Sequence, residues 1–439
     1  MKIKISKKLY NLAQIFGQEN PLFVVGGYVR NQLLKTADSD IDLACNLKLD
    51  QVAELLKNTK YNLEIKNLKL GTALISRGKE SYEYSTFRNE FYKGEGEHSP
   101  DVISFDASIV EDAKRRDFTI NSLYYNILSD EICDFYGGLE DLSTRHIRTV
   151  EDAEFVMQND GVRILRMVRL ACELNFFIDK DTLAAAKNHI TNLQSISQDR
   201  LRHEVLKIIF ADLNYHKTTK KIREFSQNLA FNGIKLLDKL NAWGYLVKKN
   251  ADLISNLQGI GSHLTSFAKA KCEDLLVSFC FDSLRYLNQC KHNITPSEFC
   301  SNFLGVGGLN FKKSEYENIL NVLNNLTSAL GLDYFDEQKV KLFCVKTLKT
   351  LTCTELRLLQ HVSKSKYKVL FNMTKSCKGL PNDISMLKFD VEKFHQQNPN
   401  FNKSRTTQLL NKLLNAVILG EVKNSHKDLI EYLNKSNKK

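Results

Sequence analysis

The feature that most constrains this chain is a short apolar run that ends in two glycines. Residues 22–25 have the pattern of a buried strand, and residues 29–35 have the pattern of a helix. Between them, Gly26 and Gly27 have no Cβ, so their backbone can take positive φ and pass close to a bulky anion. The free N–H groups and the positive end of the helix face the same point, with Arg30 beside them. The stretch therefore predicts a strand, a turn and a helix that cradle a phosphate.

Two aspartates follow in a second apolar run. Asp40 and Asp42 lie two positions apart in the stretch 40–45, which predicts a strand with both carboxylates on one face, about 7 Å apart at Cα. Carboxylates placed this way can bridge divalent cations for phosphoryl or nucleotidyl transfer. Two glycines alone are usually a turn, and Asp-x-Asp alone is usually a solvated strand face. Their order and spacing together indicate an enzyme that acts on a nucleoside triphosphate.

The composition indicates a cytoplasmic protein of several domains. A length of 439 residues suggests two to four domains. We expect no membrane partner, because no apolar run reaches the roughly 18 residues of a membrane span and the N-terminus lacks an apolar signal core. The ten cysteines are scattered without a Cys-x-x-Cys pair, which is typical of reduced thiols in the cytosol. No protein partner is inferred.

The positive charge is concentrated at one end of the chain. Residues 341–439 contain 19 Lys and Arg against 7 Asp and Glu, so they carry the whole net charge of +11. A basic region of this size beside a nucleotide site suggests a nucleic acid partner. A lysine-rich solvated surface is the alternative interpretation.

The pattern of the chain changes near residue 150. Before it, strands are predicted near residues 22–26, 40–45, 72–76, 82–87 and 102–105, and helices near 50–58 and 117–126. After it, apolar residues recur at spacings of three and four, and helices dominate to the end. The sequence therefore predicts an α+β protein, with a mixed-sheet head followed by an all-α remainder.

Two further groups of charged residues offer ligands for a nucleotide. Arg116, Asp117 and Asn121 provide donors and acceptors for a ribose and for phosphates, with Asn121 one helical turn after Asp117. On a helix, Asp160 would neighbour Arg163, and Arg163 would neighbour Arg166. Without other motifs, each group would be an ordinary surface ion pair that contributes little stability.

Taken in order, these motifs resemble the class II tRNA nucleotidyltransferases, a family that includes CCA-adding enzymes and bacterial poly(A) polymerases. The resemblance covers roughly residues 20–210, and beyond it the chain matches only a general helical RNA-binding part. The motifs are Gly-Gly-Tyr-Val-Arg at 26–30, Asp-Ser-Asp-Ile-Asp at 38–42, Arg-Arg-Asp-Phe-Thr-Ile-Asn at 115–121, Asp160-x-x-Arg163-x-x-Arg166 and Asp-Arg-Leu-Arg-His-Glu at 199–204.

The resemblance implies a metal site and a ribose site. It implies that Asp40 and Asp42 hold catalytic Mg²⁺ and that Arg116 and Asp117 contact the ribose of the incoming nucleotide. Glu83 is a candidate third carboxylate, although it could equally be an ordinary exposed strand residue.

It also implies that the protein itself reads the base, through Asp160 and Arg163. Cytosine and adenine both present an amino donor beside a ring-nitrogen acceptor, which a carboxylate and a guanidinium can recognise. Uracil and guanine place a carbonyl where Asp160 needs a donor, so the mismatch leaves buried polar groups unpaired. Such an effect can reach roughly 10⁴ in selectivity.

Three positions depart from the family pattern. Asn31 stands where the family usually has Asp, and Asn159 stands where the family has an acid before the base-reading Asp. Residues 97–100, Glu-His-Ser-Pro, replace an Arg-His-Pro stretch. The change at Asn159 bears on the switch from C to A, and the altered loop bears on the final addition of A.

The sequence thus predicts an enzyme that adds C, C and A to the 3′ end of tRNA from CTP and ATP. Residues 70–73 and 85–90 resemble CCA-adding enzymes, whereas residues 121–125 and 134–138 resemble the poly(A) branch. Poly(A) addition and partial CC-only or A-only addition therefore stay open, as does a non-catalytic RNA-binding protein. The expected parts are a catalytic head (1–145), a nucleobase-recognising neck (146–212), a helical body (213–340) and a basic RNA-binding tail (341–439).

Overall fold

The computed structural model describes residues 3–36, 40–91, 102–212, 229–264, 267, 274–346 and 353–436. They form two compact units: the first covers residues 1–264, 285–293 and 301–312, and the second covers residues 265–284, 294–300 and 313–439. The division into head, neck, body and tail stays a prediction. The loop around residues 97–100 lies outside the described residues.

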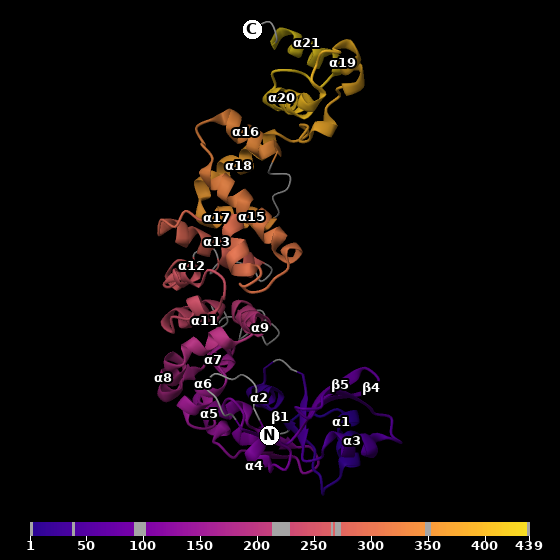
Figure 1. Ribbon diagram of the computed structural model, residues 1–439, viewed down its shortest axis with the longest axis vertical. Coiled ribbons are helices and arrows are strands. Elements are labelled where there is room, and N and C mark those ends of the chain that lie inside the picture. The colour runs from indigo at the N-terminus through magenta and orange to yellow at the C-terminus, as the bar shows by residue number, and fades with distance from the viewer. Residues whose placement is uncertain are drawn as a thin grey trace. The chain divides into compact units, whose positions relative to one another are not determined.

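A seven-stranded mixed sheet forms the centre of the head (Figure 1). The strand order is β3-β4-β5-β2-β1-β8-β9, and all neighbours are antiparallel except β2 and β5, which are parallel. Two small pairs, β6 with β7 and β10 with β11, lie outside this sheet. The strands are β1 (Phe23–Val25), β2 (Asp42–Cys45), β3 (Asn62–Asn67), β4 (Thr72–Arg77), β5 (Glu80–Thr86), β6 (Asn89–Phe91), β7 (Val102–Ser104), β8 (Tyr124–Asn126), β9 (Glu131–Cys133), β10 (His146–Ile147) and β11 (Phe177–Ile178).

One apolar cluster fixes the central strands against each other. Phe23 on β1, Ala44 on β2, Phe87 after β5 and Tyr124 on β8 are buried in it. Burying each large side chain contributes about 2 kcal/mol relative to leaving it exposed. In β5 the burial alternates, with Tyr82 and Tyr84 buried and Glu83 exposed. The strand therefore keeps one face in the core and presents Glu83 on the other.

Short helices surround this sheet, and their ends follow from local sequence. Ser108 and Glu111 form a capping box at the start of α4, in which each side chain bonds the other's backbone N–H. The helices of the head are α1 (Lys7–Phe16), α2 (Gly27–Leu34), α3 (Leu49–Leu56), α4 (Ile109–Lys114) and α5 (Gly138–Thr144).

The helix expected near residues 117–126 is wrong. Residues Thr119–Asn121 form a single 3-10 turn, η1, and the chain then enters β8. Tyr124 and Tyr125 pair with Val25 and Val24 of β1, so the sheet recruits a segment whose aromatic residues suit a strand.

Helices follow the head in the rest of the first unit, as the spacing predicted. In α7, Leu165 and Val168 are fully buried, and α7 packs on α9 and α11. These helices are α6 (Ala153–Asn159), α7 (Val162–Leu174), α8 (Lys180–Asn188), α9 (Gln198–Ile209), α11 (Leu229–Lys239) and α12 (Ala251–Ser255).

The later helices complete an α+β protein, which confirms the expected fold class. A core of apolar residues from α20 and α21, including Leu413 and Leu429, stabilises the end of the chain. Among the described residues, no helix is long and apolar enough to span a bilayer. The later helices are α13 (Leu275–Gln289), α14 (Pro296–Phe299), α15 (Lys313–Gly331), α16 (Glu337–Lys346), α17 (Cys353–Val362), α18 (Lys364–Ser376), α19 (Val391–Gln397), α20 (Thr406–Leu419) and α21 (His426–Ser436).

Candidate active site

The floor of the site is built by the register of three strands. Val25, the last residue of β1, pairs with Asp42, and Asp42 pairs with Glu83 across the parallel β2–β5 step. The turn at Gly26 therefore begins directly beside Asp42. Gly26 has φ 71° and ψ −133°, a conformation that residues with a Cβ rarely adopt. The predicted strand, turn and helix are confirmed, with α2 starting at Gly27.

The carboxylates at this floor repel one another. Burial, and then the charge of Glu83, raise the pKa of Asp42 to about 6, while Asp40 adds to the effect and Arg116 opposes it. Asp40 is exposed and lies just before β2 rather than within it. Carboxylates that repel one another at close range are stabilised by a cation between them, so these oxygen donors suit a divalent metal ion.

The carboxylates at this floor suit Mg²⁺ better than a metal ion whose ligands would all have to come from the protein. Among the described residues, no group of three or more His, Cys, Asp or Glu side chains is arranged around a common metal position. Magnesium is usually bound through one or two carboxylates, with waters and substrate phosphates as the other ligands. The pair Asp40 and Asp42 meets that requirement.

A chain of hydrogen bonds runs along one wall from the head to the neck. The Arg30 guanidinium donates to Asn121 Oδ1, and Asn121 Nδ2 donates to Asp117 Oδ1 at 3.1 Å. Arg166, on α7, donates through Nε to Asp117 Oδ2 at 2.7 Å. The 3-10 turn η1 thus still brings Asn121 to Asp117, although neither residue is on the helix expected there.

The pKa values along this wall reflect its buried charges. Burial alone would raise the pKa of Asp117, but Arg166, Asn121 and Arg163 hold it down at about 2. Burial, together with Arg169 and Arg166, lowers the pKa of Arg30 to about 10. An arginine does not lose its proton in a protein, so this shift means that Arg30 carries its charge in an unfavourable place.

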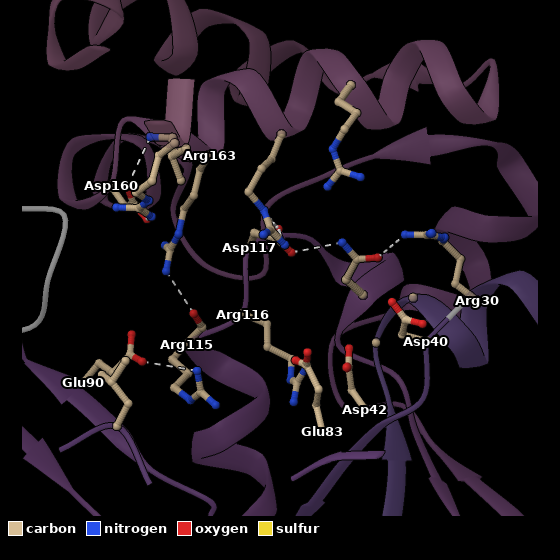
Figure 2. A pocket seen from close by; sticks show the side chains of 18 of the residues that line it. Arg30, Asp40, Asp42, Glu83, Glu90, Arg115, Arg116, Asp117, Asp160 and Arg163 are labelled. Atoms are coloured by element: carbon tan, nitrogen blue, oxygen red, sulfur yellow. Dashed lines mark hydrogen bonds and ion pairs between the residues drawn. The ribbon is translucent and has the colours of Figure 1, made fainter. Parts of the chain in front are cut away.

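The two expected base-reading residues lie at the start of α7. Asp160 is not on a helix: its backbone is extended, at φ −143° and ψ 99°, between α6 and α7. Its Oδ1 accepts the backbone N–H of Val162, at 3.1 Å, and its Oδ2 lies 3.3 Å from Arg200 on α9. Arg163 donates to the carbonyl oxygen of Arg115 at 3.0 Å, away from Asp160 (Figure 2).

The twelve residues proposed from the sequence as catalytic or nucleotide-binding all line one cavity of about 720 Å³. The cavity lies within the first unit, between the seven-stranded sheet and the helices α7 and α9 (Figure 2). The predicted residues that line it are Gly26, Gly27, Arg30, Asp40, Asp42, Glu83, Arg116, Asp117, Asn121, Asp160, Arg163 and Arg166.

Eight more residues line the cavity that sequence reasoning did not place there. Arg88, Glu90 and Arg115 form one ion-pair network, with Glu90 Oε1 at 2.8 Å from Arg88 and 3.2 Å from Arg115. Arg169, three residues after Arg166 on α7, also lines it. In the sequence, two features could have indicated these residues: Arg115 is next to Arg116, and Arg88 follows the strand of Glu83. The eight are Leu70, Arg88, Glu90, Arg115, Val162, Arg169, Arg200 and Lys207.

The cavity is rich in positive charge. Its lining carries nine Arg and Lys against six Asp and Glu. Like charges held together at partly buried positions favour an anionic ligand. The geometry can therefore hold a polyphosphate with a divalent metal at one end and recognise a polar group near α7 at the other.

Two protein-family models match the first half of the chain. Residues 22–148 match the poly A polymerase head domain. Residues 175–226 match the probable RNA and SrmB-binding site of polymerase A.

Curated relatives match a little under half of this chain. Over 187 residues, the chain is 36% identical to a CCA-adding enzyme of Levilactobacillus brevis, covering 43% of this chain and 46% of the relative. Over 212 residues, it is 34% identical to poly(A) polymerase I of Salmonella typhimurium, covering 46% of this chain and 44% of the relative. The chain thus aligns with about half the length of these curated relatives.

Solved structures share the fold over nearly the whole chain. The CCA-adding enzyme of Bacillus stearothermophilus in complex with CTP superposes with a TM-score of 0.67 at 19% identity, covering 98% of this chain and 96% of that one. The Thermotoga maritima CCA-adding enzyme complexed with tRNA gives a TM-score of 0.61 at 19% identity, covering 99% of this chain and 98% of that one.

Proposed function

Since the head and neck of this chain belong to the class II tRNA nucleotidyltransferase and poly(A) polymerase family, we propose that the protein adds C, C and A to the 3′ end of tRNA. It uses CTP and ATP and releases pyrophosphate. The observation that carries this proposal is one cavity that joins a carboxylate pair for a metal to an Asp and an Arg suited to reading a base. Curated CCA-adding enzymes among the relatives support it.

The reaction joins the primer 3′-oxygen to the α-phosphorus of the nucleotide. The bond from that phosphorus to the bridging oxygen of the β-phosphate breaks, the primer hydroxyl loses its proton, and pyrophosphate leaves. Held by Asp40 and Asp42, Mg²⁺ would supply activation of the hydroxyl and neutralisation of the triphosphate. Gly26, Gly27 and Arg30 hold the phosphates that become pyrophosphate, because they line the cavity beside Asp42.

The other lining residues orient the nucleoside. Arg116 and Asp117 contact the ribose, and Asn121 and Arg166 hold Asp117 in place through the bonds described above. Asp160 accepts from the amino group of cytosine or adenine, and Arg163 donates to the adjacent ring nitrogen. For this, Arg163 exchanges the Arg115 carbonyl for the base.

Poly(A) addition is the second candidate function, favoured by one observation. The poly(A) polymerase I of Salmonella typhimurium is as similar to this chain as the CCA-adding enzymes are, at 34% identity over 212 residues. In that case the same cavity would accept ATP alone.

We place the protein in the cytoplasm with tRNA as its partner. Eight cysteines of the described part are free thiols, which agrees with a reducing compartment. The basic residues after position 340 provide a surface for RNA phosphates.

Replacing the metal ligands tests the enzymatic proposal. Asp40→Asn or Asp42→Asn should lower nucleotide incorporation by at least about 10³-fold, because a lost metal forfeits several kcal/mol of transition-state stabilisation. RNA binding should stay within a few-fold. Incorporation of labelled nucleotide and RNA binding by filter retention measure the two effects. Substantial turnover in both variants would refute the metal site.

A further inference from the structure

Arg30 is a buried cation whose hydrogen-bond partners are neutral. Its side chain lies on α2 and is only 8% exposed. Its Nε and one terminal nitrogen donate to Asn31 Oδ1, at 3.1 and 2.9 Å, and its other terminal nitrogen donates to Asn121 Oδ1. Within the described part of the chain, Arg30 forms no ion pair.

The two acidic groups whose charges act most on Arg30, Glu173 and Asp117, form ion pairs with other arginines. Glu173 lies 3.3 Å from Arg169, and Asp117 lies 2.6 Å from Arg166. A buried guanidinium that is hydrogen-bonded but not neutralised costs free energy that an anionic ligand can recover. The lowered pKa of Arg30 agrees with this position.

The side chain at position 31 determines whether the positive charge of Arg30 is neutralised. Its side-chain oxygen occupies the place where an aspartate, which has nearly the same shape, would form a two-point ion pair with Arg30. The amide fixes the direction of the guanidinium and leaves its charge available. Asn121 does the same from the other side, since Asp117 holds its amide nitrogen.

We propose that Asn31 keeps Arg30 charged but unneutralised, so that the turn after β1 binds the polyphosphate part of its ligand more tightly than an aspartate at 31 would allow. The ligand is the triphosphate tail of the nucleotide or the pyrophosphate product. This inference rests on the proposed function, since it concerns the same cavity. It makes Asn31 a positioning residue, because it acts through Arg30.

Calorimetric titration of the full-length protein with inorganic pyrophosphate tests the role directly. Asn31→Asp should weaken the binding of pyrophosphate and of CTP about tenfold. The new carboxylate would form an ion pair with Arg30, which would then bind the ligand phosphates less strongly. The inhibition constant of pyrophosphate in the addition reaction should rise by a similar factor. The melting temperature should not fall, because the new carboxylate compensates a buried charge.

Two controls separate this role from a general effect of charge. Asn62→Asp, at an exposed position on β3, adds the same charge far from the cavity lining and should change affinity by less than about twofold. In an Arg30→Met background, Asn31→Asp should have no more effect than Asn62→Asp.

Unchanged or tighter pyrophosphate binding in Asn31→Asp, or an effect that persists without Arg30, would overturn the proposal. A loss confined to inorganic monophosphate would overturn the polyphosphate assignment. If the unmodified protein binds neither pyrophosphate nor CTP, the proposed function itself fails.

Discussion

Asp117 is the residue on which the electrostatics of the cavity wall depend. It accepts from the Phe118 backbone at 2.8 Å, from Asn121 at 3.1 Å and from Arg166 at 2.7 Å. Arg166 comes from α7, so this one carboxylate joins a turn of the head to the first long helix of the neck. Asp117 therefore has two roles: it provides the proposed ribose contact, and through Arg166 it connects the turn before η1 to α7.

The lowered pKa of Asp117 predicts a dependence of stability on pH. Because the folded value is about 2 and the unfolded value is about 3.9, ionised Asp117 stabilises the fold above pH ~4 and loses that contribution as the pH falls towards 2. The contribution is at most roughly 3 kcal/mol, since one pKa unit corresponds to about 1.4 kcal/mol. Asp117→Asn should therefore be less stable than the unmodified protein at pH 7, and the difference should shrink as the pH approaches 3.

Urea unfolding at a series of pH values measures this difference. Asp50→Asn, at an exposed position in the first turn of α3, serves as the control and should show only a small, shallow dependence. A difference between the Asp117 variant and the unmodified protein that stays constant from pH 7 to pH 3.5 would contradict the assigned pKa.

At the scale of elements, the chain is predictable where local sequence decides the structure. The strand before Gly26, the turn and the helix after it were predicted because a glycine pair between two distinct apolar patterns leaves few alternatives. The carboxylates of Asp42 and Glu83 could be proposed together from the family resemblance, and the parallel pairing of β2 with β5 makes them neighbours. That pairing joins segments about 40 positions apart, which no local pattern determines.

Elements whose conformation depends on packing were predicted less well. Residues 124–126 join the sheet beside β1, so the helix expected there is absent. Asp160 has extended backbone between α6 and α7. The next residue, Gly161, packs so closely on Asn192 that a Cβ there would lie 2.9 Å from it, a tertiary contact that no local pattern shows. Arg88 follows β5 and Glu90 lies on β6, and the only sequence signal for their place in the cavity is that they come soon after the strand of Glu83.

The start of α7 should control the choice of base. Arg163→Ala removes the donor to the ring nitrogen while Arg30 and the glycine turn keep the phosphates. We expect discrimination against UTP to fall by roughly 10²-fold or more, since a missing polar partner costs several kcal/mol of selectivity. The KM for CTP should change less than this ratio.

Single-nucleotide incorporation with CTP, ATP and UTP measures that selectivity. Arg145→Ala, at the end of α5 and outside the cavity lining, is a suitable arginine control. Unchanged rejection of UTP by Arg163→Ala would contradict its role as a base reader.

At the scale of the whole molecule, the net positive charge and the candidate active site lie in different parts of the chain. The candidate active site lies in the first unit, whereas the basic excess lies after residue 340 in the second. Helix α18 displays exposed lysines, and Tyr367 and Phe371 stack along it at 5.7 Å between ring centroids. Exposed cations beside aromatic rings suit contacts with RNA phosphates and bases.

Neutralising part of that surface should reduce the salt dependence of RNA binding. Replacing Lys364 and Lys368 on α18, and Lys378 just after it, with Gln removes up to three phosphate contacts. Each lost contact lowers the slope of log K against log salt by about 0.9. The matched control replaces three exposed lysines of the head, Lys57, Lys60 and Lys79. Equal slopes for the two triple variants would count against α18 as an RNA contact.

The sequence of the product tests the central claim most directly. Purified protein is given tRNA that lacks its 3′ end, with CTP and ATP alone and together, and the RNA ends are sequenced. A CCA-adding enzyme yields two C residues with CTP alone and a defined C-C-A end with both nucleotides. A long run of A would show poly(A) addition, and a stop after C-C would show partial activity; either result would contradict the proposed function, as would the absence of any added nucleotide.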